Sequence, residues 1–445
     1  MTVIDEPNLE SIGGTPVRVR GSEPMIDENR DTNTFRVNRS ALRDPDVFSL
    51  EQERIWGHNW LYLGHESEVA TPGDFKVRSL GGRPLIFCRD ESSEIQVFLN
   101  SCPHRGTALC REEAGNARFF RCFYHAWTFN TAGELIALPG PEGYPEGDDF
   151  RDRLSLRSVP QFESLRGFVF INFDEHAGPL REHLGNAADY IEMVADHSSV
   201  GMEVLPGTQR YTVWGNWKLT VENAMDGYHF APTHITFLEY LKRTGYVTSD
   251  EGGRNVRLDN GHSVLLLTGH SGRAGMQWEP RFGEEERLRI EANRAELTER
   301  LGPERTAKIA DVSRILFVFP NLILFDIEAL SIRRLEPTAA DRTDVDAWEL
   351  APMDETPAAR AMRNRVLVSF IGPGGLATPD DIEAYEAIQR GIIATANDPR
   401  PGVDWSDISR GMIHDDQMVG RSTDEGGIRH FWRHWNATLY GKDPS

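Results

Sequence analysis

Between residues 61 and 175, apolar and polar residues alternate over short runs rather than at helical spacing. A period of two is the pattern of a strand that buries one face, and turn-forming residues separate the runs. The runs cover residues 75–78, 84–89, 95–99, 119–122 and 167–173. This part of the chain is therefore predicted to be a small all-β domain.

A second series of strand-like runs follows, at wider spacing and mixed with helical patterns. The runs lie at 210–214, 263–268, 315–325, 348–351 and 366–371. Residues 284–301 have the charged composition of a solvated helix. Upstream, Asp44 is typical of a helix cap, and Phe48, Ile55 and Trp56 follow at helical spacing. The second half is predicted to hold a larger sheet accompanied by helices.

The composition and charge of the chain exclude several classes of protein. The 48 Lys and Arg residues against 69 Asp and Glu give a net charge of −21, which argues against binding to nucleic acid or to an anionic membrane surface. The longest apolar candidate, at 315–327, is interrupted by Pro320 and Asn321, so it falls short of the roughly 18 residues of a membrane span. Residues 1–10 lack a signal pattern, and four cysteines do not make a disulfide framework. We expect a soluble protein of a reducing compartment, the cytoplasm.

Two cysteine–histidine pairs carry the strongest chemical signal. Cys102 and His104 form C-x-H, and after 17 residues Cys122 and His125 form C-x-x-H. Two thiolates and two imidazoles are the ligand set of a Rieske [2Fe–2S] cluster, in which neutral histidines on one iron raise the reduction potential. A Cys₂His₂ zinc site is the alternative, although zinc motifs usually keep like ligands together. The other cysteines, at 88 and 110, are expected to be structural thiols.

A second constellation has the spacing D-x₂-H-x₄-H, formed by Asp226, His229 and His234. On one continuous helix Glu222, Asp226 and His229 would share a face, whereas the two histidines would diverge. Pro232 lies between the histidines and is predicted to break the helix. Such a break would allow both imidazoles to reach one metal ion.

Two histidines need a carboxylate to form the facial triad of a non-haem Fe(II) oxygenase. A candidate lies in segment 372–383, where Thr378 and Pro379 are typical of a helix start and Asp380 and Asp381 follow in its first turn. The helix dipole favours carboxylates there without any metal. On local grounds, both acids can be simple helix-start residues.

The segments 102–127, 216–234 and 372–383 occur together and in this order. In this combination the chain resembles the large (α) subunit of Rieske non-haem iron aromatic-ring-hydroxylating dioxygenases, most of all p-cumate-type and related monoaromatic dioxygenases. The resemblance implies an α+β fold: a small all-β Rieske [2Fe–2S] domain plus a larger helix-grip catalytic domain with an antiparallel sheet flanked by helices. The implied boundaries are an N-terminal arm at 1–35, a helix of the catalytic domain at 36–60, the Rieske domain at 61–175 and the catalytic domain at 176–445.

The resemblance also implies roles for individual residues. The cluster ligands would be Cys102, His104, Cys122 and His125, and the ligands of the mononuclear Fe(2+) would be His229, His234 and Asp381. Asp226 matches the catalytic aspartate that connects the cluster of one subunit to the iron of its neighbour. The substrate pocket is expected to include Asn223, Met225, Phe230, Phe317, Leu324 and Leu376.

The implied activity is that of a terminal oxygenase component, which adds both atoms of O₂ to an aromatic ring and gives a cis-dihydrodiol. Electrons would come from NAD(P)H through a separate ferredoxin or flavin reductase, since this chain has no G-x-G-x-x-G fingerprint. The assembly would be an α₃ trimer or an α₃β₃ complex with a small β subunit. Two alternatives stay open: a Rieske monooxygenase or demethylase, and an electron-transfer protein with an inactive iron site.

Overall fold

The computed structural model describes residues 24–144, 148–245, 253–268, 272–396, 398 and 400–441. Most of the arm expected at 1–35 lies outside the described residues. Its described end contains β1 (Ile26–Asn29), which pairs with β2 (Thr34–Asn38). β2 pairs in turn with β21 (Trp405–Asp407), so the beginning of the described chain is joined to its C-terminal part.

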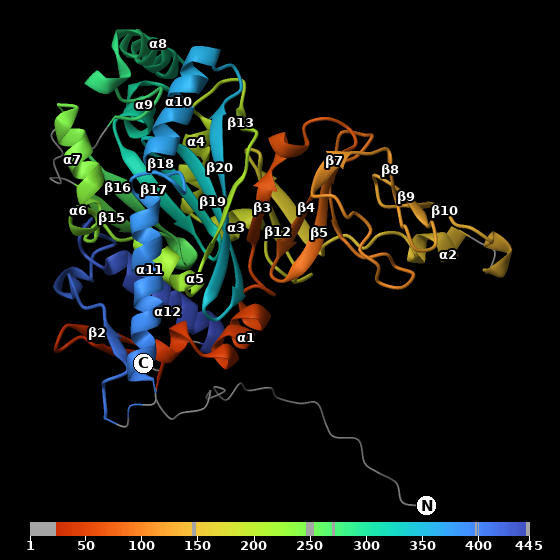
Figure 1. Cartoon of the computed structure of the whole chain (residues 1–445), viewed down its shortest axis with the longest axis horizontal. Coiled ribbons are helices and arrows are strands. Elements are labelled where there is room, and N and C mark those ends of the chain that lie inside the picture. Colours follow the sequence, from red (N-terminus) through yellow and green to blue (C-terminus); the bar gives the residue numbers. More distant parts are fainter. Residues whose placement is uncertain are drawn as a thin grey trace, which may run out of the picture.

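The small part of the molecule, drawn in orange and yellow in Figure 1, is built from three antiparallel sheets. One sheet has the order β6 (Ile95–Leu99), β5 (Arg83–Arg89), β4 (Asp74–Leu80) and β7 (Ala114–Asn116). The second has the order β10 (Leu135–Ala137), β9 (Thr128–Asn130) and β8 (Phe119–Arg121). The third joins β11 (Gln161–Leu165), β12 (Phe168–Asn172) and β3 (Leu61–His65). The all-β prediction is confirmed here, and the described residues of this part add one short α-helix, α2 (Asp148–Arg153).

The large part is organised around one antiparallel sheet. Its order is β13 (Met202–Val204), β20 (Arg342–Pro352), β19 (Ala329–Ala339), β18 (Leu322–Ile327), β17 (Ser313–Val318), β16 (Ser263–Leu267), β15 (Arg254–Arg257) and β22 (Val419–Arg421). β14 (Gln209–Val213) also pairs with β20. The prediction of a strand at 366–371 is wrong. Most of these residues form the last turn of α10 (Pro357–Ser369), a helix that the Thr356 side chain caps.

Side chains alternate along these strands, so successive residues face opposite sides of the sheet. On one side Leu316, Leu324 and Ile332 pack with α3 (Leu180–Leu184) and α4 (Ala187–Ala195). The opposite side, which carries Phe317 and Phe325, is covered by α5 (Trp217–Ala224), α10, α11 (Thr378–Ile392) and α12 (Gly426–Tyr440). Near α4, α8 (Glu284–Leu301) packs with α9 (Pro303–Ala310). Both faces of the sheet are therefore buried.

The N-terminal helix α1 (Pro45–Arg54) is attached to the large part by one fully buried carboxylate. Glu51 accepts hydrogen bonds from Trp217 Nε1 at 2.9 Å and from Trp435 Nε1 at 2.7 Å, and it forms an ion pair with Lys218. Neither Glu51 nor Lys218 exposes any of its side chain to solvent. This contact ties α1, α5 and α12 together.

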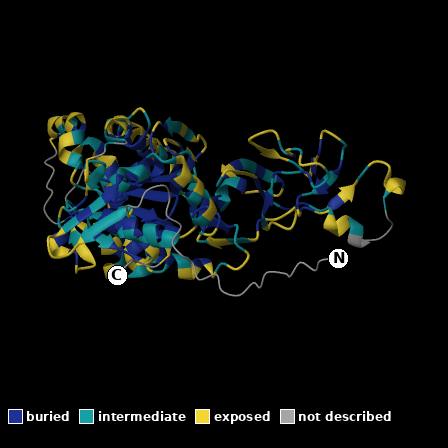
Figure 2. Ribbon diagram, turned by 90° about the horizontal axis from the view of Figure 1, so that it is seen from below, coloured by how far each residue is buried: buried dark blue, intermediate teal, exposed yellow. Residues whose placement is uncertain are grey.

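Figure 2 shows the buried residues gathered in the large sheet and in the strands beside it, with exposed residues on the outer helices and loops. Within the described part of the chain, every helix is too short or too polar to cross a lipid bilayer. Figure 1 places β8 and β9 at one end of the molecule, whereas α6 (Phe230–Thr233) and α7 (Ile235–Arg243) lie at the other. The two candidate metal motifs are therefore far from each other within one chain.

Candidate functional site

The helix that leads into the histidine motif is shorter than the continuous helix considered from the sequence. α5 ends at Ala224, so Asp226 and His229 lie beyond it. The single helical face expected for Glu222, Asp226 and His229 is therefore wrong. Glu222 is instead directed to α12, where its carboxylate accepts a hydrogen bond from Trp432 Nε1 at 2.6 Å.

Two short helices position the histidines. His229 directly precedes α6, and His234 lies between α6 and α7. His234 has φ −97° and ψ 43°, outside the helical region, so the chain bends at this residue. Pro232 lies inside α6, and the break predicted at the proline falls two residues later.

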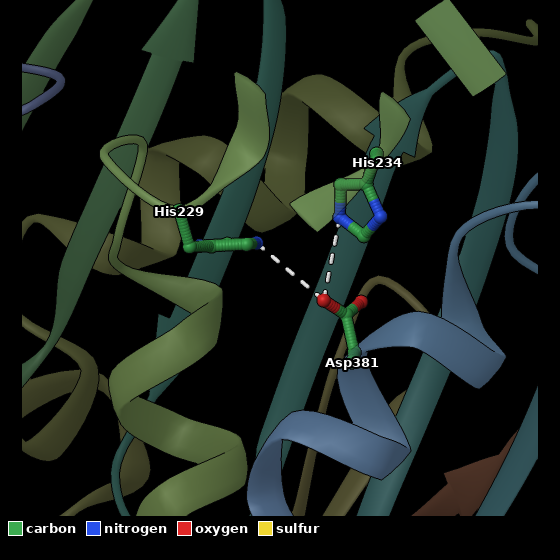
Figure 3. Close-up of side chains that lie close together, drawn as sticks. All are labelled: His229, His234 and Asp381. Carbon is green, nitrogen blue, oxygen red and sulfur yellow. Dashed lines mark ion pairs between the residues drawn. The ribbon is translucent and has the colours of Figure 1, made fainter. Parts of the chain in front are cut away.

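The three expected iron ligands converge. Nε2 of His229 lies 3.5 Å from Oδ1 of Asp381, and Nε2 of His234 lies 3.3 Å from the same oxygen. Figure 3 shows both imidazoles directed at this carboxylate, which projects from the first turn of α11. One ligand atom from each residue lies within 4.8 Å of the other two. Two imidazoles and one carboxylate on one side of a potential ion are a donor set that suits Fe(II) and leaves other positions open.

The other ring nitrogen of each histidine faces a second acid. Asp226 Oδ2 lies 3.3 Å from Nδ1 of His229, and Asp380 Oδ2 lies 3.4 Å from Nδ1 of His234. A proton held on Nδ1 by a carboxylate leaves the Nε2 lone pair available to a metal. The sequence predicted only a helix-start role for Asp380, and its contact with His234 was missed because it depends on where α11 meets α6.

The carboxylates around the histidines determine the charge of this site. Burial alone would lower the pKa of His229, but its hydrogen bonds to Asp226 and Asp381 raise it to about 9. Burial would raise the pKa of Asp381, but both histidines hold it below its usual range. Asn223 adds an amide donor, with Nδ2 at 3.1 Å from both Asp381 Oδ1 and His229 Nε2. The site thus concentrates negative charge that a metal cation would balance.

A cavity opens beside the three ligands. Its apolar wall comes from one face of the large sheet, since residues paired across neighbouring strands share a face: Leu265, Leu267, Ile315, Phe325 and Ile327. Helices and their connections supply Phe230, Phe370, Ile371 and Ala377. Among the polar lining residues are Thr378 and a buried arginine, Arg333.

Of the six expected pocket residues, Asn223 and Phe230 line this cavity and the other four do not. Leu324 faces the opposite side of the sheet, where it pairs with Leu316 and joins the core that contains α4. Phe317 packs against Phe431 of α12, with ring centroids 5.8 Å apart. Met225 and Leu376 are part of the packing under the helices.

The two cysteine–histidine loops have the same backbone design. The N–H of Cys102 donates to the carbonyl of Thr107, and the N–H of Cys122 donates to that of Trp127, both at 2.8 Å. Each cysteine carbonyl accepts from the residue four positions later, Gly106 at 2.8 Å and Ala126 at 2.9 Å. Both of these residues have positive φ, 75° and 58°. Two equivalent loops thus present one cysteine and one histidine each.

The side chains of the two loops meet. The rings of His104 and His125 are 4.6 Å apart, and His104 stacks on Trp127 with an interplanar angle of 8°. Burial, together with a side-chain hydrogen bond to the Cys122 thiol, raises the pKa of the Cys102 thiol. Two sulfurs and two imidazoles at the meeting point of two loops fit the donor set of a Rieske cluster better than separate surface residues.

Comparison with known proteins gives matches over both parts. Residues 59–162 match the Rieske [2Fe-2S] domain, and residues 195–441 match the ring hydroxylating alpha subunit (catalytic domain). The chain is 33% identical to toluate 1,2-dioxygenase subunit alpha of Pseudomonas putida, over 88% of this chain and 85% of that relative. It is 33% identical to the 2-halobenzoate 1,2-dioxygenase large subunit of Burkholderia cepacia, over 92% and 86%. The solved naphthalene 1,2-dioxygenase of Rhodococcus sp., bound to indole, superposes with a TM-score of 0.76 at 27% identity, over 92% of this chain and 95% of that one.

Proposed function

The chain belongs to the family of α subunits of Rieske aromatic-ring-hydroxylating dioxygenases, and on this premise we propose how its residues divide the reaction. The protein is a terminal oxygenase, an oxidoreductase that uses a [2Fe–2S] cluster and a mononuclear Fe(2+). In this division the two loops of the small part serve the cluster, and the converging ligands of the large part serve the iron.

His229, His234 and Asp381 hold the mononuclear iron in this proposal. Bound there, iron(II) supplies the redox chemistry that adds both atoms of O₂ to one face of an aromatic ring. Asp226 and Asp380 keep the proton of each imidazole on Nδ1 and fix the ring planes. The apolar wall around Phe325 holds the substrate ring beside the ligands and excludes water from it.

Cys102, His104, Cys122 and His125 hold the cluster in this proposal. Bound there, the cluster accepts and passes on single electrons. The backbone bonds of the two loops fix the ligands relative to each other, while the exposed side chains of Phe123 and Tyr124 leave this end of the molecule open to a partner.

The family works as a terminal oxygenase with ferredoxin or reductase partners and often with a β subunit. We propose that a separate ferredoxin or flavin reductase, fed by NAD(P)H, reduces the cluster. We also propose that the chain assembles as α₃ or α₃β₃, so that the cluster of one subunit serves the iron of the next. The separation of the two motifs within one chain supports this assembly (Figure 1).

Asp226 is the proposed link between subunits. Together with His229 it lines the cavity beside the iron ligands and also a second, more open hollow. A carboxylate that contacts an iron-binding imidazole and also faces outward is suitably placed to accept a hydrogen bond from a cluster histidine of the neighbouring subunit. His125 is our candidate for that donor.

The observation that carries the proposal is the convergence of three ligand atoms beside an apolar cavity. The test supplies the holoprotein with a ferredoxin, a reductase, NADH and ¹⁸O₂. Because two relatives are named for aromatic acids and one for a neutral arene, both benzoate and naphthalene are offered. We expect a cis-dihydrodiol with two labelled oxygens. A product with one labelled oxygen would contradict dioxygenation and indicate a monooxygenase.

The cluster assignment has its own test. The reduced protein should give the rhombic electron paramagnetic resonance signal of a Rieske centre, and Cys122→Ser should abolish it. Purified protein with stoichiometric zinc and no acid-labile sulfide would contradict the assignment.

A further inference from the structure

Among the residues that the structure describes, one buried cation of the catalytic part has no carboxylate within ion-pair distance. Among the described residues, eight arginines are buried: Arg78, Arg257, Arg273, Arg314, Arg333, Arg334, Arg363 and Arg429. Seven of them have a carboxylate oxygen within 4.0 Å. Arg333 is the exception in this part of the chain. An unpaired buried charge is strongly unfavourable, so the lack of a partner at this position needs an explanation.

The position of Arg333 in the sheet explains why it has no carboxylate partner. It is 3% exposed and lies on β19, paired with Ile323 of β18 and Ala347 of β20, on the sheet face that lines the cavity. Its neighbour Arg334 points to the opposite face, where it forms an ion pair with Asp346. The guanidinium of Arg333 is thus directed into the cavity rather than into the apolar core behind the sheet.

The guanidinium is held in place but only partly satisfied. Its carbon lies 4.3 Å from the centroid of Phe325, and Nη2 donates to the carbonyl of Ile371 at 3.1 Å and to Oγ1 of Thr378 at 2.8 Å. Nε is buried and has no acceptor. Thr378 is three residues before Asp381 on the first turn of α11, so the arginine is connected to the same helix start as the proposed iron ligand.

We propose that the cavity accepts an aromatic acid and that Arg333 binds its carboxylate. This inference rests on the proposed function, because it names the substrate class of the same cavity. A carboxylate would supply the missing negative charge, and the planar fork of a guanidinium suits two oxygens. The apolar wall formed by Ile315, Phe325 and Ile327 would then hold the ring. A neutral arene would leave the arginine without a counterion.

The test compares benzoate with benzamide, which has the same shape and no charge, by titration calorimetry on the iron-loaded wild-type protein without reductant. A charge-assisted bond in a buried site predicts that benzoate binds about 10- to 100-fold more tightly than benzamide. Benzamide that binds as tightly as benzoate, or benzoate that does not bind, would overturn the proposal. This comparison needs no variant.

Variants locate the charge. Arg333→Gln should remove the preference for benzoate, and Arg333→Lys should retain part of it, because lysine keeps the charge without the fork. Arg334→Gln is the matched control: it removes a buried arginine of the same strand on the other face, and the preference should stay at the wild-type value. A preference that survives in Arg333→Gln protein with normal iron content would refute the role of this residue.

Binding and turnover separate this inference from the proposed function. Selective benzoate binding without a dihydrodiol product would leave the carboxylate site in place and contradict the oxygenase chemistry. A dihydrodiol from naphthalene, with no preference for benzoate over benzamide, would support the chemistry and contradict the carboxylate site.

Discussion

The buried pair Glu51–Lys218 allows a quantitative test of what holds the N-terminal helix to the catalytic part. Glu51→Gln keeps the size of the side chain but removes the charge that faces Lys218, and its single amide oxygen can accept from only one of the two indole N–H groups. Burial already lowers the pKa of Lys218, and the Glu51 carboxylate opposes that shift. Without the carboxylate, a buried ammonium would have lost its counterion. Breaking one side of a buried pair costs about 3–5 kcal/mol.

That loss can be converted into a melting temperature. For a chain of 445 residues, an unfolding entropy of roughly 2 cal/mol/K per residue turns it into a fall of about 3–5 °C. A second variant, Glu51→Gln with Lys218→Met, removes both charges. It should recover the part of the lost stability that comes from the unpaired ammonium, because the desolvated ion no longer exists.

Differential scanning calorimetry of the metal-loaded proteins is the appropriate assay. Glu284→Gln on the exposed face of α8 serves as the control, since it breaks an ion pair with Arg287 at the surface and should not shift the melting temperature measurably. A stabilising role for the buried pair is refuted if Glu51→Gln is as mild as this control, or if the double variant is less stable than the single one.

Three further predictions concern individual acids and one histidine. Asp226→Asn should retain iron and a reducible cluster but slow product formation by orders of magnitude, and rapid-mix kinetics with wild-type rates of cluster oxidation would rule out the linking role. Asp381→Ala should lose iron, whereas Asp380→Ala should keep it with affinity reduced about 10- to 100-fold, as iron analysis after dialysis can measure. Burial lowers the pKa of His434 to about 4, below the 6.5 of an unfolded chain, so the unfolded state binds the extra proton and stability falls as pH drops from 6.5 towards 4. His434→Phe should remove about 2 kcal/mol of the stability lost between pH 7.5 and pH 5, and an unchanged pH dependence of denaturant unfolding would refute this.

The parts of the site that were predictable are those specified over a few residues. The spacing of Cys102 to His104, or of His229 to His234, is a local signal, because each pair is presented by a single loop or bend. Asp381 could be predicted as an iron ligand only because the other motifs occur in the same chain. The end of α5 at Ala224 was not predictable, because Glu222 bonds to a residue of α12 that lies more than 200 positions further along the chain.

The cavity wall was harder to predict than the ligands. Residues 315–327 are apolar at nearly every position, because the sheet is buried on both faces and alternation gives no sign of which face holds the cavity. Leu324 was expected to line the pocket, but its neighbour Phe325 does so. Arg333 was overlooked because a charged residue inside a strand gives no local sign of its burial.

The two metal motifs lie at opposite ends of the folded molecule, and this separation has a genetic consequence (Figure 1). In the proposed ring, a chain that has lost Cys122 disables the iron of its neighbour and not its own, and a chain that has lost His234 still donates electrons. Two inactive alleles expressed together would therefore complement each other. In a closed ring with random mixing of equal amounts, about one site in four would combine an intact iron with an intact neighbouring cluster. A mutation near the cluster would therefore inactivate the iron site of the adjacent subunit, and not the iron site of the chain that carries the mutation.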